Sequence, residues 1–102
     1  KAYIKAIQMA LNDVYGEGLS EDGAWGPATR SAISAHVLKR GDQNNYVAVL
    51  QIGLLAKGYN LTSVDAVFGS DTESKLISFQ RNEGLTADGK AGLATMTILA
   101  GR

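Results

Sequence analysis

Residues 22–33 read DGAWGPATRSAI, and two later stretches repeat the spacing of their Asp, Gly, Thr and last apolar residue. Residues 65–76 read DAVFGSDTESKL, and residues 88–99 read DGKAGLATMTIL. Asp and Gly are residues that fix tight turns, and the Thr and the apolar residue that follow have helical spacing. We therefore predict that each stretch is an elbow, in which a loop turns directly into a helix. We name them the first, second and third elbow.

The polar and glycine positions of the elbows are expected to serve the fold and not catalysis. An Asp beside a loop glycine normally accepts backbone N–H bonds, which fixes the turn. The elbows do not match a calcium-binding loop, which needs oxygen ligands at alternate positions and a later bidentate Glu. The motif residues are Asp22, Gly26 and Thr29, then Asp65, Phe68, Gly69 and Thr72, and finally Asp88, Gly92 and Thr95.

A longer repeat contains the first two elbows. Residues 4–33 align without a gap on residues 47–76 when the chain is shifted by 43 positions. Seven positions of this window are identical, whereas average amino-acid usage gives about two. Gln8 falls on Gln51, and Gln80 stands before the third elbow. We expect these three glutamines to bond loop backbone from within helices.

Apolar residues recur along the chain with the helical period of about 3.6 residues. Ile4, Ile7 and Leu11 line one face of a first helix, and four later stretches follow the same period. No convincing run alternates between apolar and polar residues, as a half-buried strand would. The fold is therefore predicted to be all-α, a small bundle of about five helices in which two pseudo-repeats pack together.

Several residues indicate where these helices begin and end. Pro27 suits a first helical position, and Ser70 and Glu73 have the spacing of a capping box. Gly41 and Gly58 stand where helix ends need a left-handed residue.

The composition excludes several classes of function. Ten basic residues balance ten acidic ones, so no basic stripe is available for nucleic acid or an anionic membrane. The chain has no Cys and one His, which excludes disulfides and the usual zinc sites. No apolar run approaches the roughly 18 residues of a membrane span. We expect no metal, no cofactor, no catalytic residue and a monomeric chain.

Residues 38–99 carry a series of short motifs in a fixed order. They resemble the small three-helix peptidoglycan-binding domain that is found beside many cell-wall hydrolases and phage endolysins. The residues that carry this resemblance are Leu38, Gly41, Asp42, Leu50, Gln51, Leu54, Gly58, Tyr59, Asp65, Phe68, Gly69, Thr72, Phe79, Gln80, Gly84, Leu85, Asp88, Gly89, Thr95 and Leu99.

The first part of the chain resembles a truncated copy of the same domain. It departs from the family pattern after Ile33, where His36 and Val37 replace the Phe-Gln pair and the third helix. The second copy lacks the usual Gly after Asp65 and has Ala66 instead. The resemblance thus divides the chain into a truncated first repeat, residues 1–41, and a complete second repeat, residues 42–102.

The resemblance implies a non-catalytic module that binds bacterial peptidoglycan and targets a covalently attached lytic enzyme. That enzyme would be an amidase or a muramidase of a phage or a bacterium, acting outside the cell or at the wall. A different class of function is also open: a protein-interaction or autoinhibitory module that keeps the fold without binding glycan.

Aromatic and cationic residues near the helix ends are the candidates for ligand contact. Aromatic rings can stack on sugars, and an Arg can meet the carboxylates of stem peptides through its fork geometry. We expect the acids Glu17 and Glu21 to be solvated loop charges, and His36 to be a buried or rim residue. The ligand candidates are Tyr15, Trp25, Arg30, Tyr59 and Arg81.

Overall fold

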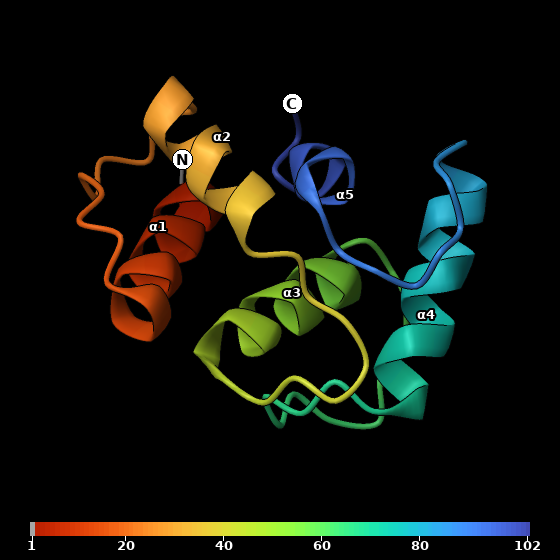
Figure 1. Cartoon of the computed structure of the whole chain (residues 1–102). Coiled ribbons are helices and arrows are strands. Elements are labelled where there is room, and N and C mark those ends of the chain that lie inside the picture. The colour runs from red at the N-terminus through yellow and green to blue at the C-terminus, as the bar shows by residue number, and fades with distance from the viewer. Residues whose placement is uncertain (1) are drawn as a thin grey trace.

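The computed structural model describes residues 2–102, which form five α-helices (Figure 1). These are α1 (Ala2–Tyr15), α2 (Pro27–Ala35), α3 (Asn45–Ala56), α4 (Ser70–Asn82) and α5 (Leu93–Leu99). In this part of the chain, β pairing is limited to two isolated bridges, Leu38 with Ala91 and Gln43 with Val67. The prediction of an all-α fold with about five helices is confirmed.

Helix α3 lies at the centre of the molecule and the other elements surround it (Figure 1). Helix α1 packs along one side of α3, whereas α4 lies on the other side and α5 lies over α2 and α3. Two hydrogen bonds show that α1 and α3 run antiparallel. Tyr3 Oη donates to Val49 O at 2.8 Å, and Asn45 Nδ2 donates to Asp13 Oδ2 at 2.8 Å.

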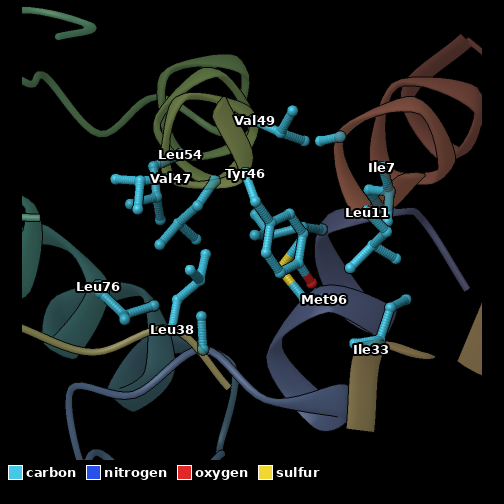
Figure 2. Close-up of a cluster of buried hydrophobic side chains, with 14 of the residues drawn as sticks. Ile7, Leu11, Ile33, Leu38, Tyr46, Val47, Val49, Leu54, Leu76 and Met96 are labelled. Carbon is cyan, nitrogen blue, oxygen red and sulfur yellow. The ribbon is translucent and has the colours of Figure 1, made fainter. Parts of the chain in front are cut away.

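Side chains from all parts of the chain share one hydrophobic core (Figure 2). Ile7, Leu11 and Ile33 reach it from the first two helices, and they meet Tyr46 of α3 and Met96 of α5. Because α3 is covered on several sides, its apolar residues surround the helix and do not form a single stripe. The central helix therefore depends on both ends of the chain for its burial.

The sequence predicts where two helices begin, and one of these predictions is confirmed whereas the other is wrong. Pro27 is the first residue of α2, after the N-cap Gly26. The capping box at Ser70 does not form, because Gly69 is the N-cap of α4 and no side chain caps this helix. Glu73 instead pairs with Arg40, whose Nη1 lies 3.0 Å from Glu73 Oε1.

Gly41 does not end a helix, contrary to the sequence-based expectation. Helix α2 ends at Ala35, and the chain then crosses to α3 as a loop. Gly41 has a φ of 99° in a turn of this loop, and its N–H donates to Phe68 O at 3.0 Å. The left-handed backbone of Gly41 is thus part of a turn that binds the second elbow through this hydrogen bond. Gly58, with a φ of 93°, does follow the end of α3 as predicted.

The hydroxyl groups of Tyr46 and Tyr3 differ in hydrogen bonding. Within residues 2–102, the hydroxyl of Tyr46 is the buried side-chain oxygen that has no hydrogen-bond partner. It lies among apolar side chains of the core near Met96 (Figure 2), and this burial raises its pKa. Tyr3, in contrast, donates its hydroxyl hydrogen to Val49. Gly53 permits this approach, because a Cβ there would collide with the Tyr3 ring.

We predict that Tyr46→Phe keeps or raises the free energy of unfolding, by up to about 1 kcal/mol, because it removes a buried hydroxyl without a partner. Tyr3→Phe should lower the free energy of unfolding by about 1 kcal/mol, because it breaks a hydrogen bond and leaves the Val49 carbonyl without it. Urea unfolding of both variants measures the difference. Equal losses in the two variants would contradict the core geometry described here.

Candidate functional site

A buried glutamine from the preceding helix holds the second elbow in place. Gln51 Nε2 donates to Val67 O at 3.1 Å, and the Ala66 N–H donates to Gln51 Oε1 at 3.0 Å. The same Nε2 also lies 3.1 Å from Asp65 Oδ1 and 3.0 Å from Thr72 Oγ1. Since an amide has two N–H hydrogens, the three acceptors share them. One side chain thus binds the turn and the first helical turn together.

The first elbow has the same set of contacts. Gln8 Nε2 lies 3.0 Å from Ala24 O, 3.1 Å from Asp22 Oδ1 and 3.0 Å from Thr29 Oγ1. The Gly23 N–H donates to Gln8 Oε1 at 2.8 Å. Gln8 belongs to α1 and Gln51 belongs to α3. Helix α1 therefore holds the first elbow in the same way as α3 holds the second.

The third elbow repeats the arrangement once more, with Gln80 of α4. Its Nε2 lies 2.8 Å from Lys90 O, 3.2 Å from Asp88 Oδ1 and 3.2 Å from Thr95 Oγ1. The Gly89 N–H donates to Gln80 Oε1 at 3.0 Å. The bonds to loop backbone that the sequence predicts for the three glutamines are therefore present in all three elbows.

The elbow aspartates are hydrogen-bond acceptors of the fold. Asp22, Asp65 and Asp88 each accept the backbone N–H two residues later, at 3.0 Å. The backbone N–H of Ala24 lowers the pKa of Asp22, and that of Val67 does so for Asp65, with a further contribution from the glutamines. A carboxylate held in its ionised form by such bonds is a poor general acid.

Each elbow needs a left-handed residue at the position after its Asp. Gly23 has a φ of 70° and Gly89 a φ of 71°, and the second elbow has Ala66 there with a φ of 63°. Within residues 2–102, Ala66 is the only residue other than glycine with a positive φ. Since this conformation crowds a Cβ, the second elbow is strained where the other two are not.

A cleft opens on the outer side of each elbow. The cleft of the third elbow has a volume of about 410 Å³, compared with about 220 Å³ for the second and about 190 Å³ for the first. The third cleft therefore offers the most room to a ligand. Its lining residues are Gln80, Gly84, Leu85, Thr86, Asp88, Lys90, Gly92, Leu93, Ala94 and Thr95.

Two of the predicted ligand residues lie at the corner where α3 and α4 end. The Tyr59 hydroxyl accepts a hydrogen bond from Asn82 Nδ2 at 2.7 Å, and the Tyr59 ring meets Phe79 edge-on at 5.7 Å. Arg81 precedes Asn82 on α4 and is exposed. This corner adjoins the third cleft, which begins at Gln80 and continues from Gly84.

The other three candidates lie in the first part of the chain, away from that corner. Tyr15 stacks on His36 with 3.6 Å between ring centroids, so one face of its ring is covered. Trp25, in the first elbow, is half-buried and packs against the core, whereas Arg30 is exposed on α2. The five candidates therefore do not converge on one site.

Two acids that the sequence predicts to be solvated loop charges, Glu17 and Glu21, have side-chain partners in the structure. Glu17 pairs with His36 at the half-exposed rim, and Glu21 accepts a hydrogen bond from Asn12 Nδ2 at 2.9 Å. Sequence reasoning missed Thr86 and Lys90 of the third cleft. These two residues stand two positions before and two positions after Asp88 in the sequence. This position would have identified them only if the loop were known to line a cleft.

Membrane-spanning helices and metal-binding clusters are both absent from the described residues 2–102. Helices there are too short, or too polar, to cross a bilayer. No group of three or more His, Cys, Asp or Glu side chains in this range is placed to hold a metal ion.

Comparisons with known proteins agree on one family. The profile of the family named "Putative peptidoglycan binding domain" matches residues 43–99, which include the second and third elbows. A probable N-acetylmuramoyl-L-alanine amidase of Bacillus licheniformis is 27% identical over 99 residues, which cover 95% of this chain and 28% of the amidase. The chain thus spans less than a third of the length of that relative.

Solved structures with the same fold include two that are well above 25% identical. The N-terminal domain of SleB is 38% identical, with a TM-score of 0.63 over 65% of this chain and 90% of that domain. The endolysin of Burkholderia AP3 phage is 43% identical, with a TM-score of 0.62 over 66% of this chain and 26% of the endolysin.

We predict that Ala66→Gly raises the free energy of unfolding by about 0.5–1 kcal/mol, because glycine adopts the left-handed backbone without crowding. Ala24→Gly in the first elbow is the matched control. Its position has no positive φ, so the same change should cost about 0.5–1 kcal/mol there. Thermal or urea unfolding gives both values, and a loss of stability in Ala66→Gly would contradict the strain described above.

Proposed function

Because the chain belongs to the peptidoglycan-binding domain family, we propose that it binds the bacterial cell wall and thereby holds an attached lytic enzyme at its substrate. The chain itself is a non-catalytic domain. Tethering raises the local concentration of substrate around the attached enzyme without changing its chemistry. The observation that carries this proposal is the family match over residues 43–99, because it covers the third cleft and the corner beside it.

The proposed ligand surface combines the third cleft with the corner at the end of α4. Lys90 and Arg81 are exposed cations that can meet the carboxylates of stem peptides. Leu85 and Leu93 give the cleft half-buried apolar walls, suited to the methyl groups of N-acetyl sugars. Tyr59, held by Asn82, offers a ring of fixed orientation for contact with a sugar.

The first part of the chain is proposed to be a truncated copy of the same domain, with residues 1–41 as the first repeat and residues 42–102 as the second. Support comes from the shift of 43 positions and from the equivalent contacts of Gln8 and Gln51. A second, weaker contact with the wall is proposed at the first elbow, which has a small cleft and also contains the candidates Trp25 and Arg30. Tyr15 can meet a ligand only with the part of its ring that His36 leaves uncovered.

The attached enzyme is proposed to cleave peptidoglycan, as the name of the amidase relative suggests for an enzyme of that kind. The likeness to a phage endolysin supports a phage as well as a bacterial source. In either case the module is proposed to act at the wall, outside the membrane, and as a monomer.

The proposed function predicts that the chain sediments with purified cell walls and releases neither reducing sugar nor amines from them. Lys90→Ala, Arg81→Ala and Tyr59→Ala should each weaken this binding, by about threefold to fivefold for the two exposed cations. Arg30→Ala removes the same kind of charge on the far part of the chain and should weaken binding less than Arg81→Ala.

Co-sedimentation at low salt with increasing amounts of wall measures these affinities, and circular dichroism verifies that each variant is folded. Wild-type chain that stays wholly in the supernatant would refute wall binding. Formation of a stable complex with a catalytic domain, in the absence of wall affinity, would favour the interaction module instead.

A further inference from the structure

A groove of about 710 Å³ lies between α1 and α3, away from the third cleft. Ala6 and Ala10 form its floor on α1, since their small side chains leave room beside α3. Val49 lies on the facing side and points from α3 toward α1 in Figure 2. Met9, with 49% of its surface exposed, adds an apolar edge.

Two carboxylates stand at one end of this groove, and an asparagine holds each of them. Asn45 Nδ2 donates to Asp13 Oδ2 at 2.8 Å, and Asn12 Nδ2 donates to Glu21 Oε2 at 2.9 Å. All four of these residues line the groove. Each of these bonds uses one carboxylate oxygen, so the second oxygen remains available to a ligand.

The charge of the groove is not compensated by this part of the protein. Among residues 2–102 the ion pairs join other acids to their cations, and neither Asp13 nor Glu21 takes part in one. None of the residues that line the groove is a Lys, an Arg or a His. An ammonium group would match the charge of the two carboxylates. A chain with small apolar side chains would match the apolar floor.

We propose that this groove binds the stem peptide of peptidoglycan, with alanine methyl groups on the floor and the amine of a diamino acid at Asp13 and Glu21. The inference rests on the proposed function, since both concern the same polymer. It adds a separate subsite for the amine of the peptide, away from the third cleft, where Lys90 and Arg81 are proposed to meet the peptide carboxylates. Helix α1 lies outside residues 43–99, so the groove exists only because the first part of the chain packs on the family domain.

Titration of the full chain with a synthetic tripeptide, L-alanyl-γ-D-glutamyl-L-lysine, tests this subsite by calorimetry or by NMR shifts of α1 and α3. Asp13→Asn and Glu21→Gln should each weaken binding by about threefold to fivefold. Ala6→Leu should abolish binding, because it fills the floor and leaves both carboxylates in place. The same tripeptide with an acetylated lysine amine should bind more weakly to the wild-type chain.

Glu73→Gln is the control, because it changes the net charge by the same amount outside the groove. Unchanged tripeptide affinity in the three groove variants would overturn the inference, as would self-association of the chain that Ala6→Leu abolishes. These results leave the proposed function intact if the wild-type chain still sediments with walls. Loss of wild-type sedimentation, in contrast, would refute the proposed function itself.

Discussion

A buried side-chain amide that binds the backbone of a turn is the interaction on which this structure depends. Gln8, Gln51 and Gln80 are each 1% exposed, and each accepts one backbone N–H and donates to one backbone carbonyl of the next elbow. A loop that turns inside a small protein leaves backbone groups away from water, and each such group without a partner costs about 1–3 kcal/mol. The glutamines satisfy these groups and fix the direction of the helix that follows.

In this arrangement the Asp, Thr and Gln side chains bind one another and the backbone of the elbow, and exposed loop residues lie beside them. In the third elbow Asp88 and Thr95 bind Gln80, and the cleft that these three residues line also includes the exposed residues Thr86 and Lys90. A scaffold of this kind suits a binding module, since the loop residues can vary without loss of the turn. The groove between α1 and α3 also opens at the surface, with the core residues Ala10 and Val49 in its wall.

The sequence predicts those features that depend on local chemistry. The spacing of Asp, Gly and Thr gave the three elbows, and the helical period gave the five helices, because turns and amphipathic faces are local properties. The capping box at Ser70 was wrong because α4 already begins at Ser70, with Gly69 as its N-cap, and Glu73 pairs with Arg40, which is 33 residues away in the chain. Likewise, the ligand surface depends on contacts such as Tyr59 with Asn82, and the groove on the packing of α1 against α3. No local pattern specifies such long-range contacts.

If one glutamine amide holds each elbow in place, the substitution Gln51→Met should lower the free energy of unfolding substantially. Methionine has nearly the same shape but removes the bonds to Ala66, Val67, Asp65 and Thr72. We predict that this variant loses about 2–4 kcal/mol of its free energy of unfolding in urea, because buried backbone groups lose their partner. A loss within about 0.5 kcal/mol, typical of a surface substitution, would contradict it.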